Sequence, residues 1–105
     1  MNGIELISAR DLDFYIESNR KVLLLDVRSR EDFEKSHLRS AINIPYEEEE
    51  AWDLPRDKKI VVYCERGATS MMAARKLKDC GYRVASVIGG IREYRGRNLV
   101  FSKQS

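Results

Sequence analysis

The sequence predicts an α/β fold of three layers, in which helices cover both faces of a mostly parallel central sheet. Short apolar, β-branched runs alternate along the chain with amphipathic helical stretches, a pattern typical of parallel strands joined by crossovers. Two of these runs, 22–25 and 60–63, are apolar throughout, as expected of buried strands. Because ligands of such sheets bind at the carboxyl ends of the strands, we expect the functional residues directly after these runs.

In the first half of the chain, the predicted strands cover residues 4–7, 22–25 and 41–44. Ser8 is a typical helix N-cap, and Asp11 at the third helical position makes a variant of the capping box. This predicted helix runs to about residue 18. Further helices are predicted over residues 29–35, with Phe33 as its anchor, and 46–52, with a turn at 36–40.

The second half continues the alternation. A strand over 60–63 ends at Cys64, and a turn around Gly67 leads into a helix that begins near Ser70. One face of this helix carries four residues that we expect in the core: Ala73, Ala74, Leu77 and Cys80. The remaining prediction is a helix stop at Gly81, a strand over 83–88, a turn at 89–90, a short helix over 91–95 and a partly packed tail over 96–105.

The chain has the length and composition of one globular domain, residues 1–105. Hydrophobic residues make up 43% and charged residues 34%, so a modest core can form without disulfides or metals. The net charge of +2 is small and dispersed, which argues against nucleic acid as a partner. No apolar run approaches the ~18 residues of a membrane span, and the start lacks the features of a signal peptide. We therefore expect a cytoplasmic protein with two free thiols, no metal site and no cofactor.

Cys64 is the candidate nucleophile. It follows a buried strand and precedes a loop of small residues and the amino end of a helix. Backbone N–H groups of such a loop can converge on one point, and the helix dipole adds partial positive charge there. Both effects stabilise a thiolate, which is the form of cysteine that attacks. The alternative, a structural cysteine at the end of a strand, does not account for the loop and helix that follow.

Three stretches of the sequence carry motifs, in order over about residues 5–95. The first lies within 24–45 and includes Leu-Leu-Asp-Val-Arg, Glu-Asp-Phe and Ser-His-Leu-Arg-Ser-Ala-Ile-Asn-Ile-Pro. The second is Val-Val-Tyr-Cys-Glu-Arg-Gly-Ala-Thr-Ser at 61–70, and the third covers 81–91. Together they resemble the signatures of rhodanese-like sulfurtransferase domains. The first has two serines in place of glycines of the usual form, the second resembles the active-site loop of the family, and the third resembles its closing signature.

The resemblance implies a rhodanese-like three-layer fold and a sulfurtransferase that works without a cofactor. Cys64 would take sulfane sulfur from a small anionic donor such as thiosulfate, hold it as a persulfide, and pass it to cyanide, a thiol or an acceptor protein. Asp26 and Arg28 would support the loop beneath the site by ion pairing with Glu31 or a neighbour, and His37 would belong to a structural turn. The donor would be bound mainly by backbone N–H groups of the loop, which comprises Glu65, Arg66, Gly67, Ala68, Thr69 and Ser70.

Two loop positions depart from the family's usual pattern. Thr69 stands where many members carry Arg, so that cation is missing from the loop. Glu65 adds a negative charge next to Cys64, which should disfavour a dianionic donor such as thiosulfate, with Arg66 offsetting it.

Two other functions remain open on the sequence alone. A cysteine-dependent phosphatase or arsenate reductase would need Cys-x5-Arg, because a bidentate guanidinium clamps the tetrahedral oxyanion. Ser70 occupies that position, and the next arginine is Arg75. A non-catalytic interaction module is disfavoured by the presence of Cys64, because such modules have usually lost the cysteine. The acidic run 47–50 is expected to be a solvated helix face, with a docking patch for a basic partner as the alternative.

Overall fold

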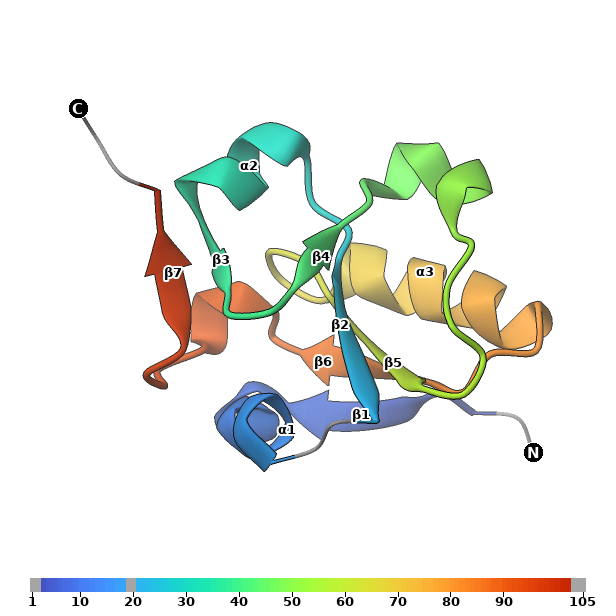
Figure 1. Ribbon diagram of the computed structural model, residues 1–105, viewed down its shortest axis with the longest axis horizontal. Coiled ribbons are helices and arrows are strands. Elements are labelled where there is room, and N and C mark those ends of the chain that lie inside the picture. The colour runs from blue at the N-terminus through green and yellow to red at the C-terminus, as the bar shows by residue number, and fades with distance from the viewer. Residues whose placement is uncertain (1–2, 19–20, 103–105) are drawn as a thin grey trace.

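The computed structural model describes residues 3–18 and 21–102 and is built around a five-stranded parallel sheet (Figure 1). The strand order is β1-β6-β5-β2-β4, so β5 and β2, which contain the two apolar runs, lie in the interior of the sheet. The strands are β1 (Glu5–Ser8), β2 (Val22–Asp26), β4 (Ile42–Asn43), β5 (Lys59–Tyr63) and β6 (Val84–Ile88).

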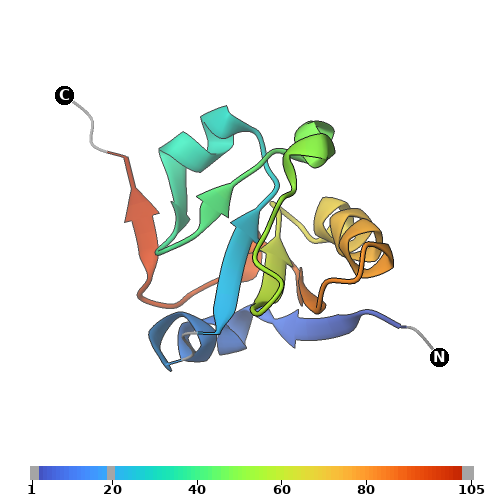
Figure 2. The same cartoon turned by 45° about the vertical axis from the view of Figure 1, so that its right-hand side comes forward.

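Helices cover both faces of this sheet, which confirms the predicted three-layer α/β/α fold. Along β5, Ile60 and Val62 pack toward the α-helix α3 (Ala68–Asp79) and the 3₁₀ helix η2 (Tyr46–Ala51), whereas the alternate residues pack on the opposite face. That face is covered by η1 (Ala9–Asp11), α1 (Leu12–Ser18) and η3 (Ile91–Glu93). Figure 2 shows α3 and α1 on opposite sides of the sheet.

A small second sheet corrects the prediction of a turn over 36–40. Ser36–Leu38 forms strand β3, which pairs antiparallel with β7 (Leu99–Phe101) beside the main sheet (Figure 1). The turn is limited to the next two residues, of which Ser40 has a φ of 72°. Local sequence could not reveal this pairing because the two strands are about 60 residues apart. In the described part of the tail, Leu99 and Val100 are half-buried, as expected, whereas Phe101 is exposed; residues 103–105 of the predicted tail lie outside the described residues.

The shorter helices also differ in detail from the prediction. The Ser8 side chain caps the first helix, as predicted, but it accepts from Arg10 N, and the first turn is the 3₁₀ helix η1. The stretch 46–52 is a 3₁₀ helix with a kink at Glu48 and not an α-helix. Helix α2 (Arg30–Lys35) begins after its N-cap, Ser29, and η3 ends at Glu93, before the predicted residue 95. Among the described residues, none of the helices has both the length and the apolar composition needed to cross a membrane.

The prediction that Cys80 lies in the core is wrong, because the residue is exposed. Helix α3 ends at Asp79, so Cys80 is its C-cap and lies beyond the helical repeat. Gly81 follows with a φ of 94°, and its N–H and that of Tyr82 donate to carbonyl oxygens of the last turn, which is a Schellman motif. This turn directs Tyr82, rather than Cys80, into the core beside Leu77.

Candidate active site

Cys64 lies at the carboxyl end of β5 and is only 4% exposed. Its sulfur atom accepts hydrogen bonds from two backbone N–H groups, those of Gly67 at 3.0 Å and Ser70 at 3.3 Å. The chain therefore curls so that amides of the loop and of the first turn of α3 point at the sulfur. This arrangement stabilises negative charge on Cys64, since both N–H groups and the amino end of the helix carry partial positive charge.

The predicted loop residues are all brought together, but they have different surroundings. Gly67 and Ser70 contact the sulfur, whereas Glu65, Arg66 and Ala68 are exposed and Thr69 is half-buried. Gly67 has a φ of 114°, and a Cβ there would lie 3.3 Å from Gly89 N, so both conformation and space favour glycine. Helix α3 begins at Ala68, two residues earlier than predicted.

Ser70 ties the loop to the sheet. Its hydroxyl donates to Gly67 O at 3.1 Å and forms a second hydrogen bond with the hydroxyl of Ser86 on β6 at 2.8 Å. Both serines are buried. Because Ser70 N also donates to the sulfur, these bonds fix the position of one of the two amides that face Cys64.

A second support comes from the turn after β6, which the sequence analysis did not connect with the site. Ile91 N donates to Cys64 O at 3.0 Å, and Arg92 N donates to Glu65 O at 3.1 Å. Gly90 packs so tightly against these carbonyl groups that a Cβ there would lie 2.6 Å from Cys64 O. The Gly89–Gly90 pair is visible in the sequence, but only the fold brings it against the loop.

On the other side of the loop, Arg28 and Asp26 form a buried ion pair. Arg28 Nη2 lies 2.8 Å from Asp26 Oδ2, and Nε lies 3.1 Å from each carboxylate oxygen. Burial lowers the pKa of Arg28, but the bonds to Asp26 outweigh that effect and the pKa is raised. The prediction named Glu31 or a neighbour as a partner, and beyond Asp26 Arg28 contacts two other groups: Nη1 lies 3.4 Å from Glu65 Oε1, and Nη2 donates to Ser36 O at 2.5 Å.

The ion pair also contacts the loop. Arg28 links the end of β2 to Glu65 directly, and its guanidinium also lies 5.8 Å from the centre of the Tyr63 ring. Burial and the neighbouring Asp26 carboxylate raise the pKa of Tyr63, whose oxygen accepts from Leu38 N at 3.0 Å. The carboxylate of Glu65 is therefore directed toward Arg28, on the β2 side of the loop.

Three arginines gather on the β6 side of the loop. Arg66, Arg92 and Arg95 line a hollow of about 450 Å³ together with Gly89 and Glu93. Of the three, the sequence analysis singled out only Arg66. The other two follow the Gly89–Gly90 turn, and nothing in the sequence alone indicated that this turn lies against the Cys64 loop.

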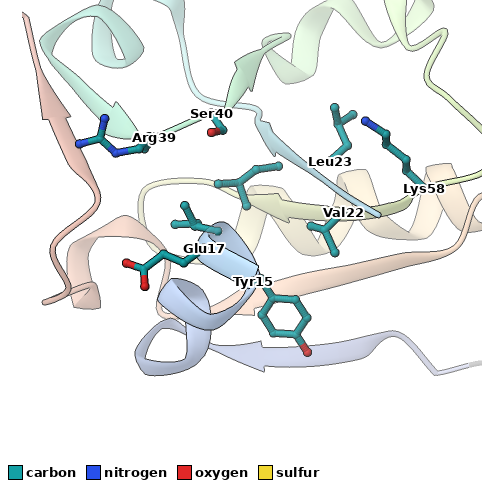
Figure 3. Close-up of a pocket in the computed structure, with 9 residues that line it drawn as sticks. Tyr15, Glu17, Val22, Leu23, Arg39, Ser40 and Lys58 are labelled. Carbon is teal, nitrogen blue, oxygen red and sulfur yellow. The ribbon is translucent and has the colours of Figure 1, made fainter. Parts of the chain in front are cut away.

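Another hollow, of about 270 Å³, lies away from Cys64, near the start of β2 (Figure 3). Figure 3 shows Arg39 and Ser40 at one side of the view, Leu23 and Lys58 at the other, and Tyr15 below them. Its lining contains neither cysteine nor histidine, so we assign no chemistry to it. His37 is also remote from a catalytic role, because its ring stacks on Phe33 and its Nδ1 bonds to Phe33 O at 2.9 Å. Within the described residues, no three side chains of His, Cys, Asp or Glu are grouped to hold a metal ion.

Comparison with known proteins gives matches over most of the chain. The sequence is 35% identical over 99 residues to the putative sulfur carrier protein YrkF of Bacillus subtilis, covering 91% of this chain and 54% of that protein. It is 34% identical over 99 residues to the adenylyltransferase and sulfurtransferase UBA4 of Candida albicans, covering 84% of this chain and 23% of that protein. The chain thus spans about half of one relative and about a quarter of the other.

The fold has a counterpart among solved structures. The rhodanese-related protein from Thermoplasma volcanium superposes with a TM-score of 0.82 at 32% identity, covering 91% of this chain and 97% of that one. The sequence also matches the family described as Rhodanese-like domain over residues 8–97, which includes the Cys64 loop and both of its supports. The chain therefore belongs to the family of rhodanese-like domains.

Proposed function

We propose that this domain transfers sulfane sulfur through a persulfide on Cys64. The observation that carries the proposal is the pair of N–H groups, from Gly67 and Ser70, that point at the Cys64 sulfur from a loop and a helix amino terminus. A thiolate needs such donors, and so do the negative charges of a persulfide and of an anionic donor. Relatives described as a sulfurtransferase and a putative sulfur carrier support the same reaction class.

The reaction has two steps. In the first, the Cys64 thiolate attacks the outer sulfur of a donor such as thiosulfate; a new S–S bond forms, the S–S bond of the donor breaks, and sulfite leaves with the electron pair. In the second, cyanide or a thiolate attacks the outer sulfur of the persulfide, and Cys64 leaves as a thiolate. No external oxidant or reductant is consumed, and the order of events is ping-pong. A reducing, cytoplasmic setting suits an enzyme whose nucleophile must remain a free thiol.

The loop residues have separate roles in this proposal. Gly67 and Ser70 hold the sulfur through their amides, and the exposed Arg66 and Ala68 and the half-buried Thr69 border the path of the donor. Glu65 repels a dianion less than its sequence position suggests, because Arg28 lies beside its carboxylate. Thiosulfate is therefore a suitable probe of the reaction, whatever the physiological donor is.

No observation favours the phosphatase or arsenate reductase reading. The position that would carry the clamping arginine is Ser70, which is buried and bonded to Gly67 O and Ser86. A non-catalytic role does not explain why two amides face the sulfur.

The test is intact mass spectrometry after treatment with thiosulfate. Wild-type protein should gain one sulfur that cyanide removes, and Cys64→Ser should gain none while it keeps the native circular dichroism spectrum. Cys80→Ser is the matched control and should load normally, because Cys80 is exposed at the far end of the 12-residue helix α3, about 18 Å along its axis. Sulfur loading on Cys80 alone, or Cys64-dependent hydrolysis of p-nitrophenyl phosphate, would overturn the proposal.

A further inference from the structure

The hollow on the β6 side of the loop has an unbalanced charge. Three guanidinium groups, from Arg66, Arg92 and Arg95, and one carboxylate, from Glu93, line it, which leaves a net charge of +2. All three arginines are exposed, and within residues 3–18 and 21–102 none of them forms an ion pair. Arg95 Nη1 is instead held by Arg92 O at 2.8 Å and Tyr94 O at 3.0 Å. Among the described residues, no carboxylate therefore pairs with these arginines, and the Arg95 guanidinium is held in place by backbone carbonyl groups.

This hollow borders the Cys64 loop. Arg66 is part of the loop itself, and Arg92 donates its backbone N–H to Glu65 O. Gly89, at the base of the hollow, lies against Gly67, whose amide faces the sulfur. A ligand held by the three arginines therefore lies next to the nucleophile, on the side away from Arg28 and Asp26.

The size and charge of the hollow define its ligand. A volume of about 450 Å³ is far larger than one small sulfur anion needs and falls in the range of extended organic ligands. Guanidinium groups bind carboxylates bidentately. Arg66 in the Cys64 loop and Arg92 and Arg95 after the glycine turn can therefore bind several carboxylates of one flexible chain.

We propose that Arg66, Arg92 and Arg95 dock an acidic segment of a polypeptide that exchanges sulfur with Cys64. This inference rests on the persulfide chemistry of the proposed function and adds the partner's chemistry to it. Because Cys64 is nearly buried, a partner must extend its thiol into the loop, and a docked acidic segment would hold that thiol in reach. The partner's thiolate attacks the outer sulfur of the persulfide; an S–S bond forms on the partner, the one at Cys64 breaks, and Cys64 leaves as a thiolate.

The first experiment compares two acceptor peptides that differ only in charge: Asp-Glu-Asp-Glu-Gly-Cys and Asn-Gln-Asn-Gln-Gly-Cys. Persulfide-loaded protein is mixed with each, and the rate of sulfur arrival on the peptide is followed by mass spectrometry. Three exposed ion pairs, each worth a factor of about two, give an expected preference of about tenfold for the acidic peptide at low salt. The preference should fall toward one at 1 M salt, where the Debye length is about 3 Å.

Variants assign the preference to the hollow. The double variant Arg92→Gln/Arg95→Gln should reduce the acidic-to-neutral ratio to about twofold, and adding Arg66→Gln should abolish it. The matched control is Arg83→Gln, which removes an exposed arginine next to β6 at its other end and should leave the ratio unchanged. Equal rates for both peptides with wild-type protein, or an equal loss in the control, would overturn the docking proposal.

A binding measurement separates docking from chemistry. Cys64→Ser protein is titrated into the fluorescently labelled acidic peptide, and anisotropy is recorded with and without the arginine substitutions. Docking with no sulfur transfer by the wild type would refute the proposed function and leave the docking site intact. Sulfur transfer at equal rates to the acidic and the neutral peptide would refute the docking site and leave the proposed function intact. Tripolyphosphate is the competing ligand, and tighter binding of it than of the acidic peptide would refute a carboxylate site.

Discussion

Gly90→Ala should slow the loading of sulfur on Cys64, although the substituted residue lies outside the Cys64 loop. Gly90 has φ and ψ of 65° and −165°, a region open almost only to glycine. A Cβ there would lie 2.5 Å from the carbonyl carbon of Glu65 and 2.6 Å from Cys64 O. Both are backbone atoms, so no side-chain rotation relieves the overlap.

The size of the effect follows from these distances. To restore a separation of 3.0 Å, which real Cβ contacts do not fall below, the loop must move by about 0.5 Å. A misplacement of ~1 Å can cost ~100-fold in rate, so half of it should cost about tenfold. The backbone strain at position 90 should also lower the free energy of unfolding by about 1–3 kcal/mol.

The matched control is Gly81→Ala. Gly81 has a φ of 94°, so an alanine there is strained too, but its Cβ would meet only the flexible side chain of Arg56, far from Cys64. Both variants should therefore lose stability in urea denaturation, and only Gly90→Ala should lose about tenfold in the rate of persulfide formation with thiosulfate. Equal loading rates in two folded variants would refute the reasoning.

A second variant keeps the test valid if Gly90→Ala does not fold. Ile91→Pro removes the N–H that donates to Cys64 O and places the proline ring where that hydrogen lay, so the loop loses the bond and must move away from η3, although proline suits the first position of this 3₁₀ helix. This variant should also load sulfur more slowly than wild type, by about threefold. A normal rate would show that the carbonyl of Cys64 needs no support from η3.

Further predictions concern charge and backbone conformation. Glu65→Gln should raise kcat/KM for thiosulfate by less than about threefold, because Arg28 already offsets the carboxylate; steady-state kinetics at low salt would detect a larger gain. Asp26→Asn should lower the free energy of unfolding by about 3 kcal/mol in urea titrations, since it leaves a buried guanidinium without its charge partner. Ser40→Gly should raise that free energy by about 0.5–1 kcal/mol, because a φ of 72° suits glycine, whereas Ser40→Ala should not. Burial tends to raise the pKa of Asp13, but hydrogen bonds from neighbouring groups outweigh burial, and the net pKa is lowered. The ionised Asp13 therefore stabilises the fold above its unfolded pKa near 3.8, and this stabilisation is lost as the pH falls. Asp13→Asn should have a lower free energy of unfolding than wild type at pH 7, and that free energy should decrease less between pH 5 and 3.

The layers of the fold and the position of Cys64, the candidate nucleophile, could be predicted because their signals are local. The apolar runs in β2 and β5 mark interior strands, and a cysteine that ends such a run before a glycine turn and a helix must lie at the carboxyl edge of the sheet. Gly67 was identified for the same reason. Its neighbours in sequence already require a tight curl of the chain.

The features that could not be predicted from the sequence are contacts between residues that lie far apart along the chain. The strand pair β3–β7, the bonds from Ile91 and Arg92 to the loop, and the direction of the Glu65 carboxylate all join residues that the fold brings together. Cys80 was misplaced for a different reason. A helical repeat was extended one residue past the end of α3, where the Schellman turn changes the direction of the side chains.

The bonds from η3 to the loop also set the order in which reactivity can appear during folding. Cys64 and Ile91 are 27 positions apart, so the loop acquires its second support only after α3, β6 and the glycine turn have been added to the sheet. In a chain that folds as it is synthesised, Cys64 emerges before the segment that holds its carbonyl. Until that segment docks, the carbonyl groups of Cys64 and Glu65 lack the N–H donors of Ile91 and Arg92. In the proposed reaction, sulfur loading therefore reaches its full rate only after β6 and η3 have joined the sheet.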